Sequence, residues 1–176
     1  MRVDILTRDE VQAVADRLAG DDLILWALGT STGLRISDIL NIRVGTIRNK
    51  SRLTVRERKT GKSRRIYISQ DIRDMISRYI DRHNLQPQDK LCPLSYVSYY
   101  RHIVAAAADV TDKHIGTHTM RKSYAYNRLT DKGYDLYTLQ HCLNHSHITD
   151  TINYTIPNAQ YRRRSDRKKG KRKNAV

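Results

Sequence analysis

The chain has 176 residues, of which 39% are hydrophobic, and it carries a formal net charge of +15 at pH 7. This length suits one domain with a single core, and the absence of an 18-residue apolar run argues against a transmembrane helix and a membrane partner. The N-terminus has no apolar signal stretch, and the two cysteines match neither a disulfide framework nor a zinc site. We therefore expect a cytoplasmic protein.

The positive charge is spread over the whole chain. Residues 161–176 hold nine Lys or Arg and one Asp, and residues 1–160 still carry seven more basic than acidic side chains. A basic body with a basic tail indicates a phosphate-rich partner, most simply double-stranded DNA. We expect a folded domain over residues 1–160 and a tail over residues 161–176 that is disordered without DNA or a partner protomer.

Helical and extended patterns alternate in the first half of the chain. Thr7 and Glu10 have the spacing of a capping box, before a helix that we expect to end at Gly20. Residues 23–28 are almost wholly apolar, which predicts a buried second helix. Three short segments alternate apolar and polar side chains and are separated by turn residues, which predicts three strands of an antiparallel sheet over 43–48, 52–57 and 64–68.

The second half of the chain is predicted to be helical. Apolar residues at helical spacing predict five helices between residue 70 and Pro157, with Ser95, Thr117 and Ser146 as N-caps of three of them. The last helix holds Tyr154 and stops before Pro157. The predicted fold class is therefore α+β, mostly helical with a small three-stranded antiparallel sheet.

Two arginines, two histidines and a tyrosine follow one another in a distinctive order. They lie in Thr32-Gly33-Leu34-Arg35, in His118-Thr-Met-Arg121, in Leu143-Asn144-His145-Ser146 and at Tyr154, nine residues after His145. Each motif alone is weak in so basic a chain, but the order and spacing together are informative. Over about residues 7–155 the chain resembles the catalytic domain of tyrosine recombinases, the phage integrase family. It is most similar to compact members that lack an N-terminal core-binding domain.

The resemblance implies site-specific DNA recombination, as integration, excision or inversion, through a 3′-phosphotyrosyl intermediate. The catalytic residues that it implies are Arg35, Lys59, His118, Arg121, His145 and Tyr154. Planar guanidinium groups suit the non-bridging oxygens of a phosphate under attack, and Asp38 is expected to support Arg35. Because arginines supply the positive charge, we expect neither a metal nor a cofactor.

Basic residues around these motifs and in the tail are the expected DNA contacts. They are Lys62, Arg64, Arg65, Lys122, Arg162, Arg163, Arg164, Arg167, Lys168 and Lys169. The family resemblance further implies a homo-oligomer, with four protomers on two paired sites. A DNA-bending accessory protein is a further candidate partner.

Two alternative functions stay open at this point. The first is type IB topoisomerase-like relaxation of DNA by similar chemistry, and the second is a non-catalytic DNA-binding module.

Tyr154 is one of eleven tyrosines in a chain without Phe, and most of the others are expected to fill the core. Helix geometry sets Tyr154 apart, because it projects about 110° away from the apolar face of its helix.

Overall fold

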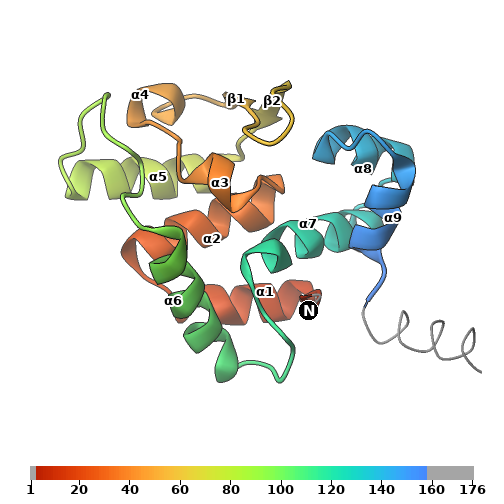
Figure 1. Ribbon diagram of the computed structural model, residues 1–176. Helices are drawn as coiled ribbons and strands as arrows, with labels where there is room; N and C mark the ends of the chain where they lie inside the picture. Colours follow the sequence, from red (N-terminus) through yellow and green to blue (C-terminus); the bar gives the residue numbers. More distant parts are fainter. Residues whose placement is uncertain (1–2, 158–176) are drawn as a thin grey trace, which may run out of the picture.

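The structure, a computed structural model, describes residues 3–157, which form a helical body with one β-hairpin along an edge (Figure 1). In chain order the elements are α1 Arg8–Ala15, α2 Gly20–Thr32, α3 Ile36–Ile39, α4 Val44–Ile47, β1 Arg52–Arg56, β2 Ser63–Tyr67, α5 Gln70–Arg82, α6 Tyr96–Ala108, α7 Thr117–Asp131, α8 Leu136–Leu143 and α9 Ile148–Thr155. Within the described residues no helix is both long enough and apolar enough to cross a bilayer.

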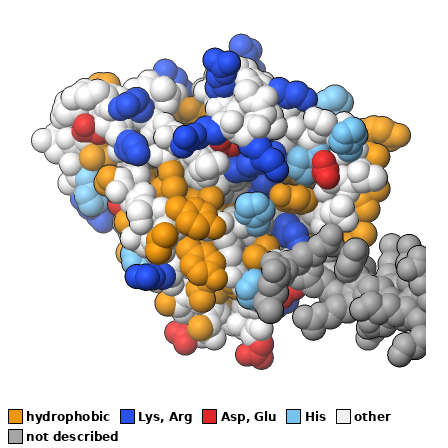
Figure 2. Space-filling model, in the orientation of Figure 1, with side chains coloured by type: hydrophobic (Ala, Val, Ile, Leu, Met, Phe, Trp, Pro, Cys, Tyr) orange, Lys and Arg blue, Asp and Glu red, His pale blue; other side chains and the backbone are white. Residues whose placement is uncertain are grey.

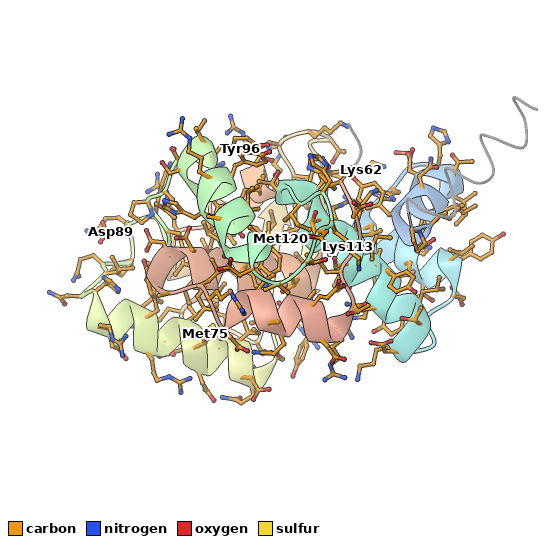
Figure 3. All side chains as sticks on the ribbon, turned by 90° about the horizontal axis from the view of Figure 1, so that it is seen from below. Lys62, Met75, Asp89, Tyr96, Lys113 and Met120 are labelled. Carbon is orange, nitrogen blue, oxygen red and sulfur yellow. The ribbon has the colours of Figure 1, made fainter. Side chains whose placement is uncertain are left out.

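Helices α2 and α7 pack together at the centre of the body. Gly29 of α2 lies so close to α7 that a Cβ added there would stand 2.4 Å from the sulfur of Met120. Met120 itself lies in the interior of the helical body (Figure 3). This close approach places the C-terminal end of α2 beside the N-terminal half of α7, and those are the two segments that lead into the arginine motifs.

Helices α8 and α9 lie against α7 at one end of the molecule (Figure 1). A small apolar cluster of Tyr124, Ala125 and Leu143 joins the three helices, and the Tyr154 ring packs against it. Asn144 ends α8 in the left-handed conformation, with φ 54° and ψ 40°, as expected for an Asn in place of Gly at a helix end. The histidine motif is therefore held at the turn between α8 and α9.

The sheet within the described residues has two strands, so the prediction of three strands is wrong. Strands β1 and β2 pair antiparallel, with Arg52 opposite Tyr67 and Arg56 opposite Ser63. Their alternating burial turns one face of the hairpin toward the helices. The hairpin thus projects its connecting turn from the helical body.

Residues 43–48, expected as the first strand, instead contain the short helix α4. The backbone N–H groups of Val44 and Gly45 donate to the carbonyls of Asp89 and Pro87, at 3.0 and 2.9 Å. Because the loop before α6 takes these hydrogen bonds and the N–H groups of Thr46 and Arg48 bond within the helical turn, the segment does not pair with β1. The alternation of apolar residues in 43–48 reflects this packing and not a strand.

The predicted helix caps are partly confirmed. Thr7 and Glu10 form the capping box of α1, and Ser95 caps α6 by accepting the N–H of Ser98. Gly20 begins α2 and does not end α1, which stops at Ala15. The N-caps expected at Thr117 and Ser146 are each displaced by one residue.

Candidate active site

Gly33 directs the chain from α2 to the first arginine. It has φ +66°, and a Cβ at this position would stand 2.5 Å from the Tyr124 ring, so both the backbone conformation and the close contact require glycine. Arg35 follows in an extended conformation at the start of α3. Its side chain is 15% exposed, and Nη1 donates to a carboxylate oxygen of Glu57 at 2.5 Å.

Glu57 is a site residue that the sequence analysis missed. Its side chain is fully buried, and the oxygen bonded to Arg35 also accepts the Thr60 hydroxyl at 3.1 Å. Burial raises the pKa of this carboxyl, but the hydrogen bond and charge of Arg35 outweigh burial and bring the pKa below its ordinary value. The available signal was the two-residue spacing of Leu53, Val55 and Glu57. This spacing places Glu57 on the buried face of the strand, next to two apolar residues.

Asp38 does not make the contact with Arg35 that was expected of it. It is buried in α3, and its Oδ1 accepts the backbone N–H of Arg58 at 3.0 Å. Glu57 takes the expected place as the acidic partner of Arg35. Asp38 therefore supports the backbone at the start of the hairpin turn.

Arg121 lies at the centre of the site. The side chain is buried, and its guanidinium donates to the carbonyls of Gly33 at 2.7 Å and Leu143 at 2.6 Å. These two bonds join the end of α2 to the end of α8 through α7. Burial, and then the charge of Arg35, lowers the pKa of Arg121 to about 10, so it remains a cation at neutral pH.

His145 lies between Arg121 and α9. Its Nε2 lies 3.1 Å from Arg121 Nη2, and its Nδ1 lies 3.0 Å from the Thr151 hydroxyl. Because a guanidinium can only donate, Nε2 accepts and the ring proton lies on Nδ1, facing Thr151. Burial, followed by the charge of Arg121, lowers the pKa of His145 to about 4, so the ring is neutral at pH 7.

Tyr154 and His118 line the same cavity. The Tyr154 ring is partly buried, with its centroid 5.0 Å from that of His145 and 5.8 Å from Arg121 Cζ. The cavity beside it has a volume of 520 Å³, and His118 reaches it from the first turn of α7. Desolvation and the charges of Arg121 and Arg35 lower the pKa of His118, so it is a candidate proton acceptor near neutral pH.

The β1–β2 turn supplies two exposed lysines on the same side of the molecule. The charge of Lys59 contributes to the lowered pKa of His118, after burial and the charges of Arg121 and Arg35. Lys62 donates to the Ser146 hydroxyl at 3.4 Å, and Figure 3 shows it on the side of α8 and α9. Figure 2 shows Lys and Arg side chains gathered over the hairpin and the neighbouring α3 and α4.

Two of the expected DNA contacts are buried. The Arg64 guanidinium donates to the Thr32 carbonyl and lies 3.9 Å from Glu57. Lys122 is also buried, and its Nζ donates to the Val3 carbonyl at 2.9 Å. The Arg64 guanidinium is therefore engaged within the protein, whereas Lys122 also lines the cavity beside Tyr154 and stays a predicted DNA contact.

The other expected DNA contacts remain predictions. Arg65 is exposed on β2, on the face of the hairpin opposite the helical body. The expected contacts in the tail lie outside the described residues; they are Arg162, Arg163, Arg164, Arg167, Lys168 and Lys169.

The neutral state of His145 predicts a stability that depends on pH. The unfolded chain binds a proton at a histidine pKa of about 6.5, whereas the folded protein holds His145 unprotonated down to a pKa of about 4. The free energy of unfolding should therefore fall as the pH drops from about 6.5 to about 5, by roughly 1 kcal/mol or less for a partly solvated ring. His118 acts in the same direction.

Urea denaturation at a series of pH values measures this effect. The His145→Asn variant should lose less stability than the native chain over the same range, because it lacks the titrating ring. Equal pH slopes for the two proteins would contradict a neutral, partly buried His145.

Comparisons with known proteins agree with this geometry. Residues 4–161 match the model of the phage integrase family. The chain is 34% identical over 138 residues to the probable integrase/recombinase YoeC of Bacillus subtilis strain 168, and the match covers 76% of each chain. The crystal structure of XerA recombinase has a TM-score of 0.76 at 20% identity, covering 94% of this chain and 64% of that one. A lambda integrase tetramer bound to a Holliday junction has a TM-score of 0.66 at 21% identity, with coverages of 89% and 49%.

The chain belongs to the phage integrase family, the tyrosine-type site-specific recombinases, and has the fold of their catalytic domain. It spans about three quarters of YoeC but only about half to two thirds of the two solved chains.

Proposed function

We propose that this chain cuts and rejoins double-stranded DNA at specific sites, with Tyr154 as the nucleophile. One observation carries the proposal: Tyr154, His145 and Arg121 lie within ring-contact distance of one another, and Tyr154 lines a cavity together with His118. Arg35 adds a second guanidinium, because the chain reaches it two residues after the Gly33 carbonyl that Arg121 binds. Side chains distant in the sequence thus gather around Tyr154, which opens onto a cavity of 520 Å³ that can admit a phosphate.

The proposed cleavage is a transesterification, in which the Tyr154 oxygen replaces the 5′ oxygen on phosphorus. The Tyr154 oxygen attacks phosphorus and forms a 3′-phosphotyrosyl link, while the bond to the 5′ oxygen breaks. His118 accepts the phenol proton, and Lys59 donates a proton to the leaving 5′ oxygen. Rejoining is the reverse, with a 5′ hydroxyl attacking the phosphotyrosine, so no external energy source is needed.

The two guanidiniums would stabilise the negative charge that develops on the non-bridging oxygens. The carbonyl bonds of Arg121 hold its plane fixed, and its buried Nε–H has no hydrogen-bond partner among the described residues. An incoming phosphate would offer that partner. The phosphate charge would also raise the pKa of His145, so that its ring could gain a proton and donate to an oxygen.

The assignment of Lys59 as the proton donor predicts a specific rescue. Lys59→Ala should slow cleavage by about 10²- to 10⁴-fold on ordinary DNA. Replacing the 5′ bridging oxygen by sulfur should remove most of this defect, because a thiolate leaves without a proton. Lys62→Ala is the control. It should weaken DNA binding, and the sulfur substitution should change its cleavage rate no more than it changes that of the native chain. If sulfur instead restores cleavage by Lys62→Ala and not by Lys59→Ala, the proton donor is Lys62.

The finer features of the reaction belong to the same proposal. By analogy with the lambda integrase tetramer on a Holliday junction, four protomers would act on two paired sites. A DNA-bending protein would assist if those sites must be bent, and the protein would act in the cytoplasm at the nucleoid, or in a host cell if carried by a phage.

The test uses a pool of DNA duplexes with a randomised centre and a nick that traps cleaved strands. After detergent treatment, DNA that stays attached to the protein is recovered and sequenced. A shared sequence among the recovered strands supports site-specific recombination. Covalent capture without a shared sequence, together with relaxation of any supercoiled plasmid, would favour a topoisomerase-like activity. No covalent capture from any sequence would favour a non-catalytic DNA-binding module and overturn the proposal.

A further inference from the structure

Glu57 is a buried carboxylate at a site that must bind a phosphate. Its side chain is fully buried, whereas the Arg35 side chain beside it is 15% exposed. A negative group here works against phosphate binding, and a buried charge is costly unless its partners compensate. The contacts of Glu57 therefore need a role other than holding DNA.

One carboxylate oxygen of Glu57 joins two elements of the site. It accepts from Arg35 Nη1 at 2.5 Å and from the Thr60 hydroxyl at 3.1 Å. Thr60 is adjacent to Lys59 in the hairpin turn, and the backbone carbonyl of Glu57 also accepts the N–H of Gly61 at 2.8 Å. The residue thus holds the arginine after α2 against the turn that carries the lysine.

A second arginine, Arg64, also contacts Glu57. Arg64 Nη1 lies 3.9 Å from the other carboxylate oxygen of Glu57, and its Nη2 donates to the carbonyl of Thr32 at the end of α2. Thr32 is three residues before Arg35. Arg64 therefore joins Glu57 to the same segment of chain that carries Arg35. Each carboxylate oxygen of Glu57 thus has an arginine beside it, Arg35 at one oxygen and Arg64 at the other.

Charge explains why the site needs such a group. Arg35 and Arg121 repel each other, and the charge of Arg35 is the largest charge effect that lowers the pKa of Arg121. A carboxylate that binds one guanidinium and attracts the other offsets that repulsion before DNA arrives. Without it, Arg35 would turn toward solvent, and binding energy from DNA would be needed to bring it back.

We propose that Glu57 is a positioning residue, whose carboxylate holds the Arg35 guanidinium and the Lys59 turn in the geometry needed for cleavage. This inference rests on the proposed strand cleavage by Tyr154. Glu57 does not touch DNA itself; it acts through the two cationic groups that do.

Glu57→Gln tests this role, because the amide keeps the shape and loses the charge. The single-turnover rate of covalent capture on a nicked duplex carrying the selected sequence should fall about 10- to 100-fold, the range found when groups that orient metal ligands are removed. The affinity for the same DNA should stay equal or become slightly tighter, since a negative charge has left the site. Glu57→Asp, which keeps the charge on a shorter arm, should fall between the two.

A slower rate at equal or tighter affinity separates positioning from a folding defect. A partly unfolded variant would lower the final amount of captured DNA, the affinity and the melting temperature together, and that result would overturn the proposal. So would a Glu57→Gln rate equal to that of the native chain. Glu10→Gln is the matched control: Glu10 of α1 pairs with Lys113 at 2.6 Å and with none of the residues proposed to act in cleavage, so its loss should leave cleavage unchanged. If the native chain captures no DNA at all, it is the proposed cleavage that fails.

Discussion

Tyr154→Phe is expected to abolish covalent capture of DNA while leaving DNA binding intact. The variant lacks the oxygen that attacks phosphorus, and no other group can form the same link. The phenyl ring can keep the edge-on contact with His145 at 5.0 Å and the packing on Tyr124 and Leu143, so the fold should persist. Capture on a nicked duplex measures the loss, and fluorescence anisotropy measures the binding.

Tyr137→Phe is the matched control for this experiment. Tyr137 lies on the neighbouring helix α8 and is 73% exposed, so its hydroxyl supports neither the core nor the site. Native capture by Tyr137→Phe and none by Tyr154→Phe is the expected pair. Capture by Tyr154→Phe at the native rate would remove Tyr154 as the nucleophile.

Arg121→Ala is expected to lose both cleavage and stability. Cleavage should fall by about 10³-fold or more, because loss of a single preorganised donor already costs about 10²- to 10³-fold. The buried carbonyls of Gly33 and Leu143 would lose their donors, which should lower the free energy of unfolding by about 2–4 kcal/mol. Chemical denaturation and single-turnover capture measure the two effects separately.

Two further variants separate the causes. Arg121→Lys keeps the charge but loses the planar fork of five N–H donors, so it should recover little of the lost rate. Arg128→Ala removes an arginine from the same helix, where it stacks over Tyr124 and Tyr134 at 5.3 and 5.5 Å, and should leave the chemistry intact. If Arg121→Ala cleaves as fast as Arg128→Ala, Arg121 has no role in stabilising charge.

The sequence predicted the longer helices and the order of the motif residues because their signals are local, whereas the four-residue helices α3 and α4 were not predicted. Helical spacing, the Thr7 capping box and the Asn144 helix end each depend on a few neighbouring residues. The error over residues 43–48 arose because strand pairing is not local. Alternation marked a half-buried segment there, but the loop at Pro87–Asp89 took its hydrogen bonds.

The roles of individual charges were harder to predict than their positions. Arg64 and Arg65 are neighbours in a basic hairpin, yet only Arg64 turns inward, to the Thr32 carbonyl. Composition favours DNA contact for both and cannot separate them, since side chains alternate across a strand and the register is needed to tell them apart. Glu57 was missed for the same reason, and it became visible only once its partner Arg35 was placed beside it.

The site geometry also changes what His145 is expected to do. In the absence of DNA its Nε2 accepts from Arg121 and its Nδ1 faces Thr151 on α9, so it links the arginine to the helix that carries Tyr154. A direct hydrogen bond from His145 to a phosphate therefore requires this pairing to rearrange. The pH dependence of stability reports on the state before that rearrangement.

Digestion of the captured protein–DNA adduct, followed by mass spectrometry of the peptide that carries the nucleotide, tests the shared site most directly. The phenol of Tyr154 lies against both His145 and Arg121, so the nucleotide should be found on Tyr154, joined through its 3′ phosphate. A nucleotide on any other residue, or one joined through a 5′ phosphate, would contradict this account of the site.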